Sequence, residues 1–114
     1  MAVQVKATLG KTKYHTEVVA GKNTLITDEP LEYGGQNSGF NPYEILATSL
    51  ASCTAATLRM YIDRKNWDVE NILVTVELEN FPLTKMAVFK RDISFENSQL
   101  SAEDVLKLHK IAEA

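Results

Sequence analysis

The sequence predicts a small α+β domain with antiparallel strands. Stretches that alternate between apolar and polar residues occupy 2–28 and 69–97, and stretches with helix start signals occupy 42–65 and 101–114. A chain of 114 residues suits one domain, 1–114, with one modest core. Its composition, with 45% hydrophobic and 24% charged residues, is that of an ordinary globular protein.

The N-terminal part predicts a three-stranded antiparallel meander. Residues 2–9 alternate as a half-buried strand does, and residues 14–20 and 24–28 predict the next two strands. Gly10-Lys11 and Gly21-Lys22-Asn23 supply short turns of suitable composition. Residues 28–41 are rich in Gly, Asn and Ser, which predicts a loop.

A long helix is predicted from Pro42 to about Lys65. Asn41 is a good N-cap, proline is favoured at the first helical position, and Glu44 stands where the acid of a capping box belongs. Asn66 is the predicted stop. Such a helix is about 36 Å long at 1.5 Å per residue, so it needs more cover than one small sheet provides.

The C-terminal part predicts two further strands and a second helix. Residues 69–80 alternate clearly, residues 81–83 predict a bend, and residues 84–97 predict the return strand. Ser101 caps a helix over 101–114, with acids in its first turn. No Gly, Asn or Pro ends this helix, so we expect the natural chain to continue beyond Ala114.

Charge and cysteine content narrow the functional classes. A net charge of −3 with scattered Lys and Arg argues against binding to nucleic acid or to an anionic membrane. One cysteine excludes an internal disulfide, and no secretory signal or membrane-spanning run is apparent, so a cytoplasmic location is expected. His15 and His109 stand alone, which argues against a metal site.

Cys53, the only cysteine, lies among small residues in the long helix. Helical periodicity places it on one face with an apolar set: Leu46, Ser49, Leu50, Ala56, Thr57 and Met60. From the pattern alone, a buried structural cysteine is the favoured interpretation. A reactive thiol is the alternative, and it needs a nearby cation, because the helix N-terminus is about three turns away.

The motifs around Cys53 resemble those of the OsmC/Ohr family of osmotically inducible and organic-hydroperoxide-resistance proteins. The resemblance is carried by Asn41-Pro42-Tyr43-Glu44-Ile45-Leu46, Ser52-Cys53-Thr54, Leu58-Arg59-Met60-Tyr61, Arg64-Lys65 and Trp67. It implies the OsmC-like fold, in which an antiparallel sheet wraps around a long central helix in an intertwined homodimer. Small residues would then let two helices approach closely, and the partner would supply the missing cover.

The resemblance also implies a reaction. Cys53 matches the peroxidatic thiol, which attacks an organic hydroperoxide and becomes a sulfenic acid. A second cysteine then forms a disulfide with it, and an external dithiol reductant resets the pair without any bound cofactor. In the family an Arg and a Glu position and ionise the thiol; here Lys22 is the nearest cation to the Arg-bearing turn.

The sequence departs from the family pattern at several positions. The family glutamate directly follows Asn-Pro, where this chain has Tyr43, and Glu44 comes one residue later. A second cysteine is absent from the 114 residues, and the Arg-bearing turn carries a lysine, which lacks the guanidinium fork. We assign the predicted substrate pocket to Tyr43, Leu46, Leu50 and Met60.

The sequence therefore supports three hypotheses about function. The leading hypothesis is a thiol-dependent protein of oxidative-stress defence that reduces organic hydroperoxides through Cys53, with Lys22 and Glu44 as candidate catalytic partners. The alternative is a non-catalytic dimeric binding protein that holds an apolar ligand in the cleft between subunits. A third is a structural dimer in which Cys53 is inert.

Overall fold

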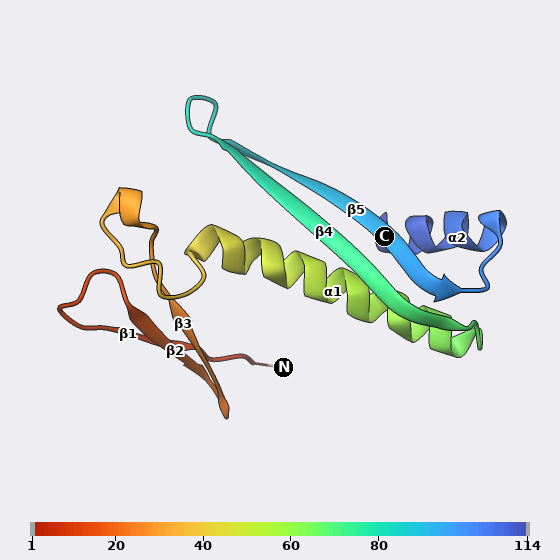
Figure 1. Ribbon diagram of the computed structural model, residues 1–114, viewed down its shortest axis with the longest axis horizontal. Coiled ribbons are helices and arrows are strands. Elements are labelled where there is room, and N and C mark those ends of the chain that lie inside the picture. The colour runs from red at the N-terminus through yellow and green to blue at the C-terminus, as the bar shows by residue number, and fades with distance from the viewer. Residues whose placement is uncertain (1, 114) are drawn as a thin grey trace. The chain divides into compact units, whose positions relative to one another are not determined.

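The computed structural model describes residues 2–113, which fall into two compact units, Met1–Leu46 and Ala47–Ala114 (Figure 1). The first unit contains strands β1 to β3, a short 3-10 helix and the first turn of helix α1. The second contains the rest of α1, strands β4 and β5, and helix α2. The predicted α+β class and its antiparallel strand pairing are confirmed.

The first unit is built on the predicted meander. Strands β1 (Lys6–Leu9), β2 (Thr16–Ala20) and β3 (Asn23–Thr27) form an antiparallel sheet in the order β1-β2-β3. Gly21 and Lys22 form the two-residue loop between β2 and β3, and Gly21 has a φ of 61°. A positive φ at the first central position of such a loop favours glycine. Strand β1 is shorter than the predicted 2–9.

Asp28 organises the loop that follows β3. Its side chain is 2% exposed. Oδ1 accepts hydrogen bonds from the backbone N–H groups of Tyr14 (3.0 Å) and Glu29 (2.7 Å), and Oδ2 accepts from the N–H groups of Gln36 (3.2 Å) and Ser38 (3.1 Å) and from the Ser38 hydroxyl (2.5 Å). The Ser38 hydroxyl, followed by these N–H groups, holds the pKa of the Asp28 carboxyl well below its ordinary value despite burial.

Two glycines of this loop are required by close backbone contacts. A Cβ atom on Gly35 would overlap the Glu29 carbonyl, and one on Gly39 would overlap the Ile26 carbonyl. Glycine lets two backbone segments approach where no side chain fits. Between them and β3 lies a single 3-10 turn, η1 (Leu31–Tyr33).

Helix α1 spans Pro42–Arg64, close to the predicted bounds, because local signals define both ends. The Asn41 N–H donates to Glu44 Oε1 (2.9 Å) and the Glu44 N–H donates to Asn41 Oδ1 (2.8 Å), which is the predicted capping box. At the other end Asn66 has a φ of 56°, and the Trp67 N–H donates to the Ile62 carbonyl (3.1 Å). These features form a Schellman motif.

The second unit is built on a long antiparallel hairpin. Strands β4 (Val69–Phe81) and β5 (Met86–Ser98) run side by side as an antiparallel pair (Figure 1). Ile72 faces Phe95, Val74 faces Ile93, and Val76 faces Arg91. These residues share one face of the hairpin, because side chains alternate along a strand. The other face is mostly polar, with Thr75, Glu77, Asp92 and Ser94 among its members.

Helix α2 (Ala102–Glu113) completes this unit. The Ser101 hydroxyl accepts a hydrogen bond from the Asp104 N–H (3.1 Å), which confirms the predicted N-cap. The predicted helix ran to Ala114, which lies outside the described residues.

The core of the second unit joins the C-terminal half of α1 to the hairpin and to α2. Its buried members are Leu58, Ile62, Val69 and Leu108, and partly buried side chains such as Trp67, Phe95 and Ile111 pack against them. Among the described residues, α1 is also the one helix long and apolar enough, by length and composition alone, to cross a membrane. A core helix passes the same test, and the buried Leu58 and Ile62 give α1 that role here.

Candidate functional site

Cys53 lies near the middle of α1, on the face that the hairpin and α2 leave uncovered. Thr54, Leu58 and Ile62 are the buried residues of α1, and they follow one another at intervals of one helical turn. Cys53 is exposed in this chain. The interpretation as a cysteine buried within its own chain is therefore wrong, because only the opposite side of α1 is packed.

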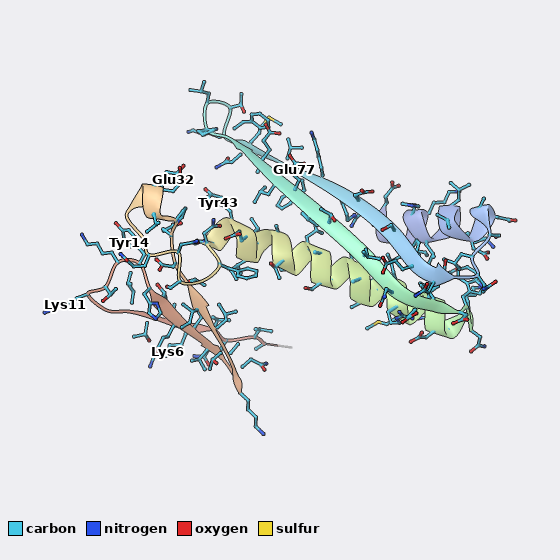
Figure 2. The ribbon with its side chains drawn as sticks, viewed as in Figure 1. Lys6, Lys11, Tyr14, Glu32, Tyr43 and Glu77 are labelled. Atoms are coloured by element: carbon cyan, nitrogen blue, oxygen red, sulfur yellow. The ribbon has the colours of Figure 1, made fainter. Side chains whose placement is uncertain are left out.

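The residues predicted to line the substrate pocket lie on the same uncovered side. Met60 is 64% exposed, Leu46 49% and Tyr43 58%, whereas Leu50 is half-buried. Tyr43 projects from the first turn of α1 (Figure 2). In the single chain these side chains form an open apolar surface on α1 rather than an enclosed cavity.

The two candidate catalytic partners of Cys53 belong to the first unit. Glu44 is engaged in the capping box with Asn41, and it precedes Cys53 by nine positions, which places it half a turn out of phase with the thiol. Lys22 is exposed at the turn between β2 and β3, in the first unit, whereas Cys53 belongs to the second. Its approach to Cys53 stays a prediction.

Arg91 is a residue near Cys53 that the sequence reasoning missed. Its Nη1 donates to the hydroxyl of Thr54 (3.0 Å), and its Nη2 donates to the carbonyl of Ala112 in the last turn of α2 (2.8 Å). Thr54 is 5% exposed and directly follows Cys53 in α1. The sequence does contain a sign of this role. The alternation along the strand places Arg91 on the same face as Ile93 and Phe95, where an apolar residue would be expected.

Arg59 makes a similar fork farther along α1. Its Nη1 donates to the Val69 carbonyl and its Nη2 to the Glu70 carbonyl, both at 2.9 Å, and Nη1 also lies 3.6 Å from Asp63 Oδ1. These bonds tie the last two turns of α1 to the start of β4. Arg59 therefore resembles Arg91 in joining α1 to the hairpin with two hydrogen bonds from its guanidinium, but neither of its acceptors is next to Cys53.

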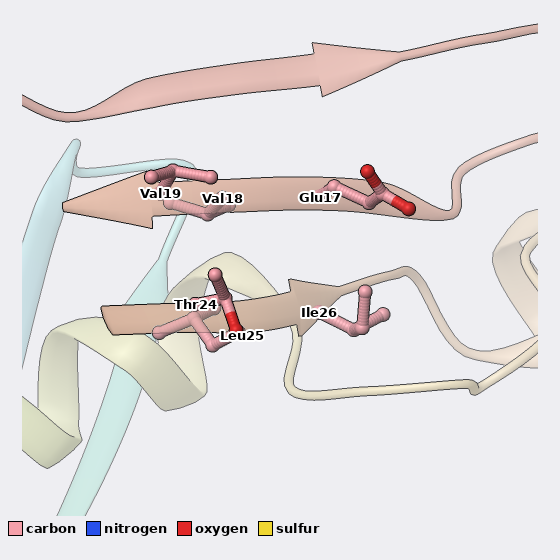
Figure 3. Close-up of a pocket in the computed structure, with 6 residues that line it drawn as sticks. All are labelled: Glu17, Val18, Val19, Thr24, Leu25 and Ile26. Carbon is pink, nitrogen blue, oxygen red and sulfur yellow. The ribbon is translucent and has the colours of Figure 1, made fainter. Parts of the chain in front are cut away.

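One hollow of the surface lies on the first unit, and none of the predicted pocket residues lines it. It has a volume of about 360 Å³ and lies on the β2–β3 hairpin, with Glu17, Val18, Val19, Thr24, Leu25 and Ile26 around it (Figure 3). Its lining is mostly aliphatic and contains neither a thiol nor a cation. It offers a surface for apolar contact rather than a reaction centre.

Comparison with known families identifies the chain. The profile of the family described as OsmC-like protein matches residues 35–114, which include α1, Cys53, the β4–β5 hairpin and α2. The chain belongs to the OsmC-like protein family. The family resemblance seen in the sequence is thereby confirmed, although no curated protein matches the chain significantly.

Solved structures of OsmC-like and organic hydroperoxide resistance proteins share this fold. A candidate osmotic stress induced and detoxification response protein from Psychrobacter arcticus superposes with a TM-score of 0.81 at 23% identity, covering 95% of this chain and 80% of that one. An OsmC-like protein from Mycoplasma pneumoniae gives 0.75 at 16% identity, with 99% and 81% covered. The organic hydroperoxide resistance protein OhrB of Bacillus subtilis gives 0.61 at 19% identity, with 98% and 83% covered.

Proposed function

We propose that this OsmC-like protein reduces organic hydroperoxides through Cys53, as part of oxidative-stress defence in the cytoplasm. The observation that carries the proposal is the position of Cys53, exposed at the middle of the uncovered apolar side of α1. An apolar surface around a thiol suits the organic group of an alkyl hydroperoxide. Several proteins of the same fold are named organic hydroperoxide resistance proteins, which supports this substrate class.

With Cys53 as the one thiol of these 114 residues, the proposed reaction takes two thiols from the reductant. The Cys53 thiolate attacks the outer peroxide oxygen, the O–O bond breaks, and the alkoxide takes a proton and leaves as the alcohol. One thiolate of an external dithiol then attacks the sulfur of the resulting sulfenic acid, and the hydroxide that leaves takes a proton to become water. Its second thiol displaces Cys53 from the mixed disulfide, so the reductant is oxidised and the Cys53 thiolate returns.

We further propose that the active form is a homodimer. The uncovered side of α1 presents Leu46, Ala56 and Met60 together with Cys53, all exposed in the single chain. Exposed apolar surfaces of this kind mark interaction sites in soluble proteins. A second copy packed over this side would enclose the thiol and convert the open surface into a pocket.

A peroxide-consumption assay with the purified protein tests the function. With cumene hydroperoxide and dihydrolipoamide we expect multiple turnovers per Cys53, and Cys53→Ser should abolish them. Hydrogen peroxide, which lacks an organic group, should react more slowly with the same protein. A wild-type rate no higher than that of Cys53→Ser would contradict the proposal.

The alternative of a non-catalytic binding protein rests on the same apolar side of α1. If it is correct, wild type and Cys53→Ser should bind an apolar fluorescent probe equally, and neither should consume peroxide. Catalytic reduction requires the opposite result, in which the peroxide assay separates the two proteins. A comparison of wild type with Cys53→Ser in both assays therefore distinguishes the two functions.

A further inference from the structure

Thr57 lies one helical turn beyond Cys53 on the uncovered side of α1. The two residues are four positions apart, which separates them by about 40° around the helix and about 6 Å along its axis. Side chains at this spacing are neighbours, with Cβ atoms about 5–6 Å apart. Both residues are exposed. A molecule that approaches the Cys53 thiol from solvent therefore also meets the side chain of Thr57.

The direction of helical side chains brings the Thr57 hydroxyl closer to the thiol. In an α-helix each Cα–Cβ bond tilts towards the N-terminus of the helix. Because Thr57 follows Cys53, its side chain leans back towards the turn that carries the thiol. Ser49 lies one turn before Cys53, so its side chain leans away from the thiol. The geometry of the helix thus favours Thr57 over Ser49 as a neighbour of the sulfur.

The hydroxyl of Thr57 is available as a donor. A threonine hydroxyl in a helix commonly bonds to a carbonyl of the preceding turn, and four positions before Thr57 that carbonyl is the one of Cys53. Within residues 2–113 the Thr57 hydroxyl makes neither this bond nor another hydrogen bond. Thr54 differs, because its hydroxyl is buried on the packed side of α1 and accepts from Arg91. Thr57 therefore offers a free O–H group at the exposed surface beside the thiol.

We propose that Thr57 is a further catalytic residue, whose hydroxyl donates a hydrogen bond to the peroxide oxygen that leaves. The inference rests on the proposed function and adds a residue that acts in it. The Cys53 sulfur forms a bond to the outer peroxide oxygen, and the electron pair of the O–O bond goes to the inner oxygen. The sulfur is thereby oxidised to a sulfenic acid. The alkoxide, reduced by this pair of electrons, takes a proton from solvent and leaves as the alcohol.

A hydrogen bond to the leaving oxygen becomes stronger as negative charge develops on it. Such a bond lowers the barrier, because it stabilises the transition state more than it stabilises the intact peroxide. A peroxyacid expels a carboxylate, which is already a stable anion and gains less from the donor. Iodoacetamide alkylates the same thiol and expels iodide, so no leaving oxygen is present. These reagents separate an effect on the leaving oxygen from an effect on the thiol itself.

The test measures the second-order rate constant for loss of the Cys53 thiol at neutral pH, with cumene hydroperoxide, peracetic acid and iodoacetamide in turn. Thr57→Val keeps the shape of the side chain and removes the hydroxyl. We expect its rate constant with cumene hydroperoxide to fall roughly tenfold. The rate constant with peracetic acid should fall less than about threefold, and that with iodoacetamide should not change. Thr57→Ser keeps a hydroxyl and should restore most of the rate with cumene hydroperoxide.

Thr48→Val is the matched control. Thr48 is also an exposed threonine of α1, but it lies five positions before Cys53 and about 140° away from it around the helix. The substitution replaces the same hydroxyl by the same methyl group in the same helix. It should leave all three rate constants unaltered.

Equal rate constants for wild type and Thr57→Val with cumene hydroperoxide would overturn the inference. An equal decrease in Thr48→Val, or an equal decrease with iodoacetamide, would do so as well. If the wild type turns over peroxide with dihydrolipoamide while Thr57→Val matches it, only the inference fails. If the single reaction of the thiol depends on Thr57 but no turnover follows, the hydrogen bond stands and the proposed function fails. A wild-type thiol that does not react with cumene hydroperoxide contradicts both.

Discussion

Ser38 donates two hydrogen bonds to one oxygen of Asp28, from its backbone N–H (3.1 Å) and from its hydroxyl (2.5 Å). The same hydroxyl lies 2.8 Å from Nδ1 of His15, the residue that precedes β2. Because the Ser38 proton is directed to the carboxylate, the His15 ring must donate to the Ser38 oxygen. This chain of bonds ties the loop before α1 to the β1–β2 turn.

Asp28→Asn should destabilise the first unit. Each carboxylate oxygen of Asp28 accepts hydrogen bonds from two backbone N–H groups, and Oδ2 also accepts one from the Ser38 hydroxyl. In either orientation, the NH₂ group of an asparagine would replace one of these oxygens and would face hydrogen-bond donors instead of acceptors. A buried donor left without an acceptor is costly. We expect the thermal midpoint to fall by at least about 5 °C, as followed by circular dichroism.

Asp92→Asn is the control for this substitution, because Asp92 lies on the polar face of β5 and is exposed. It should leave the midpoint within about 2 °C of wild type. Equal midpoints for Asp28→Asn and Asp92→Asn would mean that the Asp28 network contributes nothing to stability.

The low pKa of the Asp28 carboxyl predicts how stability depends on pH. Its pKa in the folded protein is lower than in the unfolded chain, chiefly because of the Ser38 hydroxyl, so the ionised form stabilises the fold. That stabilisation is fully present above the unfolded value, near 3.8, and is lost as pH falls through the folded value. The difference in thermal midpoint between wild type and Asp28→Asn should stay constant from pH 7 to pH 5 and shrink below pH 4. A difference that shrinks already between pH 7 and pH 5 would contradict this assignment.

The elements that depend on local signals could be predicted from the sequence. The capping box of Asn41 and Glu44 and the positive φ of Asn66 lie within a few residues of the ends of α1, and both ends were placed within a residue or two. The alternation of apolar and polar residues predicted β4 and β5 for the same reason. Interactions between residues a few positions apart leave a recognisable pattern in the sequence.

The long-range contacts could not be predicted in this way. Asp28 bonds residues 8 to 14 positions away, and Arg91 bonds residues 21 and 37 positions away, so nothing in their immediate neighbourhood identifies the partners. Periodicity correctly placed Cys53 on one helix face with Leu46 and Met60. Which face of α1 is covered within the chain depends on the hairpin and α2, so the pattern alone could not show that Cys53 is exposed in the single chain.

Ala56→Leu should weaken the proposed homodimer. Ala56 is exposed on the uncovered side of α1, whereas Ala55 is already half-buried within the chain. A larger side chain in a close helix–helix contact costs roughly 1–3 kcal/mol, so the dimer should dissociate at least about fivefold more readily. Sedimentation velocity over a concentration series measures this change.

Ala102→Leu serves as the control for that experiment, since Ala102 is an exposed residue in the first turn of α2. It should leave self-association unaltered. A wild type that sediments as a monomer at micromolar concentration would remove the dimer from the proposal.

Lys22→Met should slow the reaction of Cys53 with cumene hydroperoxide without altering the fold. Lys22 occupies the second position of the β2–β3 loop and is exposed, and the loop conformation depends on Gly21, so the substitution removes a charge and little else. If Lys22 is the cation that favours the Cys53 thiolate, within one chain or across a dimer, the second-order rate constant should fall roughly tenfold. Lys22→Arg should preserve the rate, and Lys11→Met, in the β1–β2 connection, should leave it unchanged. Stopped-flow measurements on the four proteins, combined with sedimentation to verify the dimer, provide the comparison. If Lys22→Met reacts at the wild-type rate, Lys22 takes no part in the activation of Cys53.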